Sequence, residues 1–76
     1  MEVYERETAE VIRRFLDRRI SFPECIAALD AALAGVIPYL TGEQLPRLRM
    51  VMRANNETVM KEMARRGPPA GKNSIS

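Results

Sequence analysis

Two short polar motifs divide this chain into three segments. Residues 21–24 (Ser-Phe-Pro-Glu) and 41–44 (Thr-Gly-Glu-Gln) both have the S/T-x-x-E/Q form of a helix capping box. In such a box the first side chain accepts a hydrogen bond from the backbone at the fourth residue, and the fourth side chain accepts one from the backbone at the first. The sequence therefore predicts helix starts near residues 22 and 42, with the preceding segments ending there.

Apolar residues recur at helical spacing in all three segments, which predicts helices over about residues 3–19, 22–35 and 42–66. Gly35 is expected to cap the second helix, and the apolar residues 36–40 are expected to form a packed, non-helical connector. Pro46 leaves two starts open for the third helix, at Gly42 or at Pro46 itself. The apolar face of the first helix comprises Tyr4, Thr8, Val11, Ile12, Phe15, Leu16 and Ile20.

A chain of 76 residues has room for one domain. We expect a small all-α three-helix domain, a helical hairpin or bundle, over residues 1–66, followed by a flexible tail over residues 67–76. The first and third helices are expected to pair along their lengths, with the second closing one end or side. A core this small is marginal unless a disulfide, a metal or a partner subunit supplements it.

The chain has one cysteine and no histidine. An intrachain disulfide is therefore excluded, and so is a structural zinc site built from Cys and His ligands. Without histidine the commonest nucleophile and base pairs cannot form, and no phosphate-binding glycine motif is present. Cys25 falls on the apolar face of the second helix, which indicates a buried structural thiol. We expect no enzymatic activity, no cofactor and no metal, and self-association as the supplement to the core.

Methionines concentrate on the third helix, beyond what packing on one neighbouring helix requires. This pattern favours a homodimer whose interface involves the third helix first and the first helix second, and a small protein-protein interaction or regulatory module with an unidentified protein partner. Asn55 and Asn56 fall in or beside the apolar stripe and have three interpretations: a register-fixing polar group, a recognition group, or a narrower stripe with at least one asparagine facing water. The predicted interface comprises Leu48, Met52, Asn55, Asn56, Val59, Met60 and Met63.

Charge alternates in blocks along the chain: residues 1–10 and 21–44 are net acidic, whereas residues 11–20 and 45–66 are net basic. The alternative hypothesis is a nucleic-acid-binding accessory protein that uses arginines of the first and third helices. The arginines of the third helix spread around it, and aromatic residues for base stacking are few. The basic patch predicted under this alternative comprises Arg14, Arg18, Arg49 and Arg53.

The N-terminal residues are charged and do not resemble a signal peptide. The apolar stretch over residues 25–40 is short and alanine-rich for a membrane span. We therefore expect a cytoplasmic protein with no membrane contact.

Overall fold

The computed structural model describes residues 1–67, which form three α-helices and two short 3₁₀ helices. Helix α1 spans Glu2–Leu16, α2 spans Phe22–Val36 and α3 spans Leu45–Arg66. The 3₁₀ helices Ile37–Tyr39 and Gly42–Gln44 connect α2 to α3. The all-α three-helix fold is confirmed, and the predicted tail lies outside the described residues except for Gly67.

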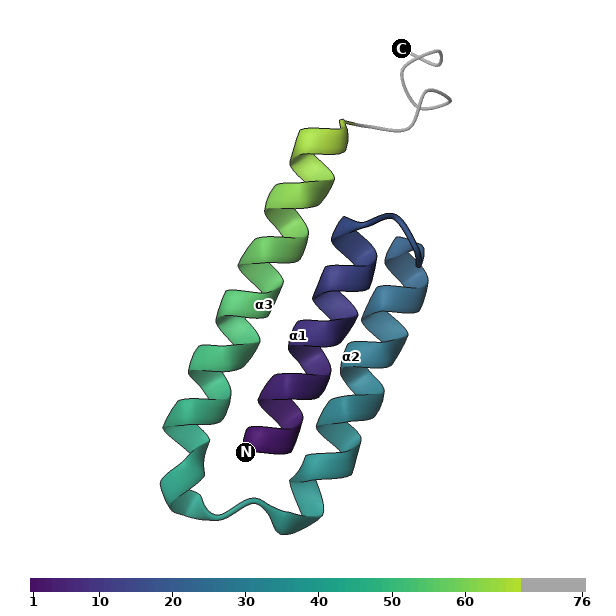
Figure 1. The fold of residues 1–76 in the computed structure, drawn as a ribbon. Coiled ribbons are helices and arrows are strands. Elements are labelled where there is room, and N and C mark those ends of the chain that lie inside the picture. The colour runs from purple at the N-terminus through teal and green to yellow at the C-terminus, as the bar shows by residue number, and fades with distance from the viewer. Residues whose placement is uncertain (68–76) are drawn as a thin grey trace.

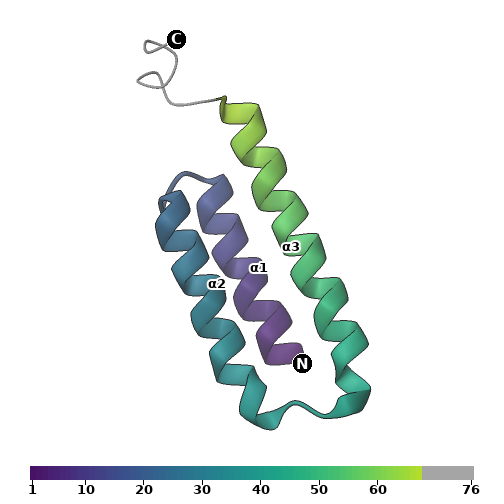
Figure 2. The same ribbon diagram turned by 180° about the vertical axis from the view of Figure 1, so that it is seen from behind.

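Helix α1 lies between the other two helices (Figures 1 and 2). The chain runs up α1, down α2 and up α3, so α2 is antiparallel to α1 and α3 is parallel to it. Both α2 and α3 pack on α1, but no Cα atom of α2 lies within 8 Å of a Cα atom of α3. The pairing of α1 with α3 was predicted, and α2 lies along one side of α1, which is the second of the two predicted placements.

The core joins the three helices through the buried face of α1. Tyr4, Thr8, Ile12 and Phe15 occur at helical spacing and are all buried, as the sequence predicted. Ile12 and Phe15 form a cluster with Cys25 of α2, which has no exposed surface, and with Val59 of α3, and Leu48 of α3 is buried as well. Leu16, predicted to share this face, is 40% exposed. Few large side chains are fully buried, which agrees with the thin core expected for this chain length.

The first helix ends at Leu16, three residues earlier than predicted. Arg18 adopts a left-handed conformation with φ of 62°. The Arg19 amide donates to the Arg14 carbonyl at 2.8 Å, and the Arg18 amide donates to the Phe15 carbonyl at 3.0 Å. These two bonds form a Schellman motif, which closes a helix after its last turn. Residue types did not predict this helix end, because the left-handed position holds arginine instead of glycine.

The capping box of α2 forms as predicted. The Ser21 hydroxyl accepts from the Glu24 amide at 3.2 Å, and the Glu24 carboxylate accepts from the Ser21 amide at 2.7 Å. In the second box, the Gln44 side-chain oxygen accepts from the Thr41 amide at 3.1 Å. It caps a 3₁₀ turn, and α3 proper begins at Leu45 with Pro46 in its first turn, where a missing N–H leaves no bond unmade.

The connection between α2 and α3 differs from the prediction. Helix α2 continues past Gly35 to Val36, and the chain then tightens into a 3₁₀ turn. Ile37 is 56% exposed and Tyr39 is 82% exposed, so the prediction of a packed connector was wrong. Because Pro38 and the 3₁₀ turn carry these two side chains away from α1, the connection adds apolar surface to this end of the molecule.

Candidate functional site

A narrow groove runs between α2 and α3, with α1 at its base. It has a volume of about 60 Å³, and residues of all three helices line it. Leu29, Leu33 and Met52 are half-buried in its walls, and Tyr4 is buried at its base. Burial raises the pKa of the Tyr4 phenol. The complete lining is Tyr4, Leu29, Asp30, Leu33, Met52, Asn55 and Asn56.

Asn55 supplies an unusual polar group to this groove. Its Nδ2 atom is buried and has no hydrogen-bond partner within residues 1–67. A buried amide donor without an acceptor costs roughly 1–3 kcal/mol, so such groups are uncommon in folded proteins. Its neighbour Asn56 is exposed at the rim. The two asparagines therefore differ: Asn55 belongs to the groove wall, whereas Asn56 is exposed, as the third interpretation predicted for at least one of them.

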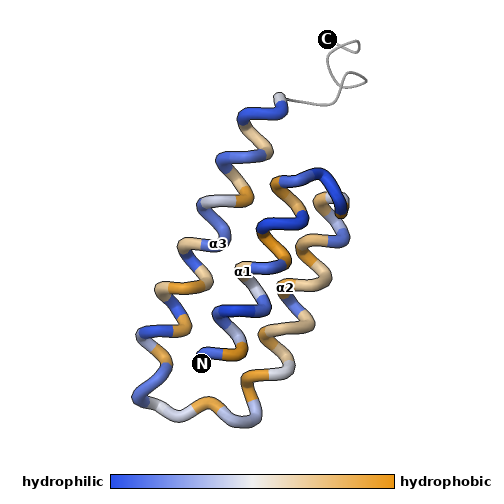
Figure 3. Tube along the Cα trace, in the orientation of Figure 1, coloured by the Kyte–Doolittle hydropathy of each residue, from blue (hydrophilic) through white to orange (hydrophobic). Residues whose placement is uncertain are grey.

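Helix α2 is unusually apolar for its exposure. Over Phe22–Tyr39 the mean hydropathy reaches 1.3 across 18 residues, and Cys25 is the one buried residue of this stretch. By length and composition alone, this stretch of the described chain could cross a membrane. Figure 3 shows apolar colours along most of α2, whereas blue segments interrupt α1 and α3. Contact with α1 alone leaves much of this apolar surface in water.

The structure divides the predicted interface into two groups. Leu48 and Val59 are buried against α1 within the chain, so they belong to the core and are not available to a partner. Met52, Asn55 and Met63 are half-buried, and Asn56 and Met60 are exposed. The surface that remains lies on one side of α3, and α2 adds the groove-lining residues Leu29, Asp30 and Leu33, which the sequence-based prediction had omitted.

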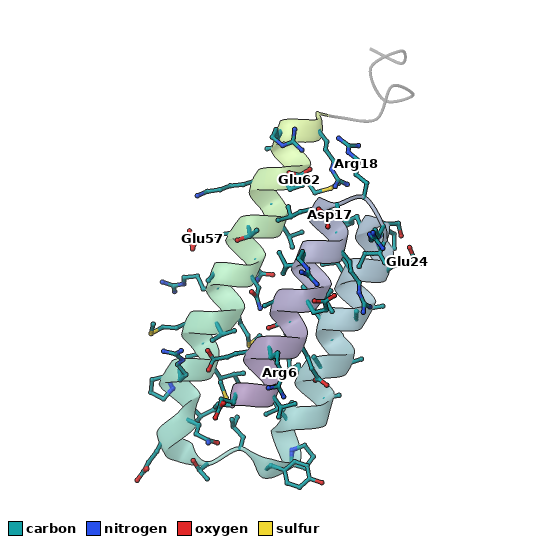
Figure 4. All side chains as sticks on the ribbon, viewed as in Figure 1. Arg6, Asp17, Arg18, Glu24, Glu57 and Glu62 are labelled. Atoms are coloured by element: carbon teal, nitrogen blue, oxygen red, sulfur yellow. The ribbon has the colours of Figure 1, made fainter. Side chains whose placement is uncertain are left out.

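The predicted basic patch is not assembled on one surface. Arg14 lines a hollow between α1 and α2 together with alanines, and its Nε atom lies 3.3 Å from the Glu10 carboxylate. Arg18 sits in the turn after α1 (Figure 4). Arg49 and Arg53 lie on α3. Many of the other arginines are paired with glutamate, namely Arg13 with Glu10, Arg47 with Glu5, and Arg65 and Arg66 with Glu62.

Glu62 is a buried carboxylate that sequence reasoning did not single out. Figure 4 shows it turned from α3 toward α1, whereas Glu57 of the same helix points into solvent. Arg65 donates to Glu62 at 2.6 Å and Arg66 at 2.7 Å. Two hydrogen bonds lower the pKa of Glu62 to about 2, and the one from Arg65 has the larger effect, followed by the one from Arg66. The i,i+3 and i,i+4 spacings signal these pairs in the sequence, but only the fold shows that the Glu62 carboxylate is buried.

Cys25 has no exposed surface, and burial raises the pKa of its thiol. The prediction of a buried thiol is confirmed. Within residues 1–67, no three Cys, Asp or Glu side chains gather closely enough to hold a metal ion. The groove between α2 and α3 is therefore the site whose geometry supports a functional argument.

Comparison with protein-family models, with curated proteins and with solved structures finds no match to this chain.

Proposed function

We propose that this chain is a small helical protein-protein interaction module that self-associates through the face formed by α2 and α3. The observation that carries the proposal is the groove between these helices, whose walls are half-buried leucine and methionine and which contains the unpartnered Asn55 amide. Burying this face would remove apolar surface from water. We also propose that the protein has no catalytic activity and is located in the cytoplasm.

The exposed apolar surface adjoining the groove supports the same proposal. Met60 is 61% exposed and lies one helical turn beyond the groove residue Asn56. Ile37 is 56% exposed and lies one turn beyond the groove residue Leu33. Apolar side chains thus extend the groove on both walls. A continuous apolar face with a few polar groups is typical of helix-binding surfaces.

The nucleic-acid alternative receives less support. Its four arginines are distributed over two helices and a turn, and glutamates pair with many of the others. Binding to duplex nucleic acid depends on a contiguous basic surface that neutralises several phosphates.

Solution mass by light scattering tests the proposal, with a matched pair of substitutions on α3. Met60→Glu places a charge beside the groove, whereas Met50→Glu places it at a similarly exposed position (64%) on another side of the helix. The wild type and Met50→Glu should have the mass of a dimer, and Met60→Glu should dimerise at least roughly ten-fold more weakly, because its charge would be desolvated. Circular dichroism verifies that both variants fold.

A wild-type chain that stays monomeric up to millimolar concentration would overturn self-association. Equal weakening by both substitutions would overturn the assignment to the α2 and α3 face.

A further inference from the structure

The two helices that form the walls of the groove differ in net charge, although within residues 1–67 Asp30 is the one charged residue in the groove lining. Helix α2 carries two acidic residues, Glu24 and Asp30, and no basic residue. Helix α3 carries six arginines and lysines against two glutamates. A ligand that matches this surface therefore needs a basic side facing α2 and an acidic side facing α3. The chain itself offers this match. When a second copy faces the first, its basic helix α3 can lie opposite α2, and its acidic helix α2 can lie opposite α3.

We infer that the partner on this face is a second copy of the chain, related by a two-fold axis that runs along the helices. This inference rests on the proposed self-association and adds its geometry. A closed two-fold dimer uses the same face of both copies, so each residue meets its counterpart by symmetry. For a face made of two helices, the axis can run along the helices or across them, and the two choices pair the helices differently.

An axis along the helices places α2 of each copy against α3 of the other. An axis across the helices places α2 against α2 and α3 against α3. In both arrangements, facing helices are antiparallel, so the helix dipoles do not distinguish them. Side-chain charge does distinguish them, because the first pairs an acidic helix with a basic one twice, whereas the second pairs like with like.

The positions of the charged residues along the helices agree with a two-fold axis that runs along the helices. Asp30 of α2 lines the same groove as Met52 and Asn56 of α3, so these residues lie at one level along the helices. Rotation about an axis along the helices preserves that level. Arg53 follows Met52 directly and lies one turn before Asn56, so Asp30 of each copy would face Arg53 of the other. Leu33 and Met52 of both copies would meet between these two ion pairs.

Engineered cysteines test the orientation. The absence of any α2 Cα within 8 Å of α3 excludes a disulfide between these helices within one copy, because bridged Cα atoms lie closer than about 7 Å. Under oxidation, the double variant Asp30→Cys with Arg53→Cys should give a covalent dimer as its main product. Asp30→Cys alone should remain uncrosslinked, because the two copies of residue 30 lie on opposite sides of the axis. Wild type is the control, since its one thiol is fully buried.

Charge reversal gives an independent readout in reducing buffer. Asp30→Arg and Arg53→Asp should each weaken dimerisation roughly five-fold at low salt, and the double variant should restore it. Efficient linkage of Asp30→Cys alone, or single reversals without effect, would overturn the axis along the helices while leaving self-association intact. A monomeric wild type would overturn both, so the two failures are distinguishable.

Discussion

The guanidinium group of Arg66 lies over the ring of Phe15, with 4.4 Å between its central carbon and the ring centroid. Its Nη2 atom also donates to the Phe15 carbonyl at 2.8 Å, and its Nε atom donates to Glu62 at 2.7 Å. The Phe15 carbonyl belongs to the last turn of α1 and also accepts from the Arg18 amide, so Arg66 adds a second donor there. One side chain from the end of α3 thus caps α1 and fastens the two C-terminal ends together.

Replacing Arg66 by alanine should destabilise the fold by about 2–3 kcal/mol, because a cation-π contact and a charge-assisted hydrogen bond are lost together. Urea denaturation followed by circular dichroism measures the change. Arg65→Ala is the matched control: Arg65 binds the same carboxylate, but its side chain is 64% exposed against 19% for Arg66. The control should lose less than about 1 kcal/mol. Equal losses would contradict the role given to Phe15.

Stability should fall as the solution is acidified, because the pKa of Glu62 is lowered from its ordinary value of 4.5 to about 2. A carboxyl group whose pKa is lower in the folded state stabilises the fold fully above its unfolded pKa. That contribution is lost as the pH falls from about 5 toward 2. Thermal unfolding at several pH values, compared with Glu62→Gln, measures it. The variant should show a shallower decline across this window, and identical slopes would refute the assignment.

Arg18→Gly should stabilise the protein by about 1 kcal/mol. Arginine at φ of 62° has a left-handed backbone that costs an L-residue roughly that amount, and glycine avoids the cost. The added freedom of glycine in the unfolded chain reduces the gain but should not reverse it. The melting temperature of the variant should rise. The neighbouring Arg19→Gly is the control, and a fall in melting temperature for Arg18→Gly would show that its side chain matters more than its backbone.

Cys25 should react slowly with thiol reagents while the protein is folded. Its side chain is fully buried and burial raises its pKa, so both access and the thiolate fraction are reduced. The rate of labelling by a chromogenic disulfide reagent should rise steeply across the urea unfolding transition. Fast labelling without denaturant would mean that the N-terminal end of α2 opens locally.

Much of the secondary structure could be predicted from local residues. The box formed by Ser21 and Glu24 places the start of α2, and Gly67 places the end of α3 at Arg66. Both signals depend on hydrogen bonds between residues a few positions apart, which sequence spacing reveals. The end of α1 was mispredicted because Arg18 takes a conformation that its residue type disfavours, and the same local reasoning then points to a longer helix.

The candidate site was less predictable. Leu48, Met52 and Val59 share one apolar stripe in the sequence, yet Leu48 and Val59 are buried by α1 and Met52 lies in the groove. A periodic pattern shows that a face is apolar but does not show which neighbour covers it. The contribution of α2 to the groove was missed for the same reason.

By itself the sequence determined that the chain forms three helices, where α2 begins and α3 ends, and that Cys25 is buried, because these follow from capping, periodicity and turn residues close together along the chain. Only the tertiary structure decided that α1 lies between α2 and α3, that Arg66 caps α1 across 51 positions, and that a groove remains between α2 and α3. Those features depend on how helix faces are shared among neighbours. Packing of the whole chain settles that division, and no local pattern encodes it.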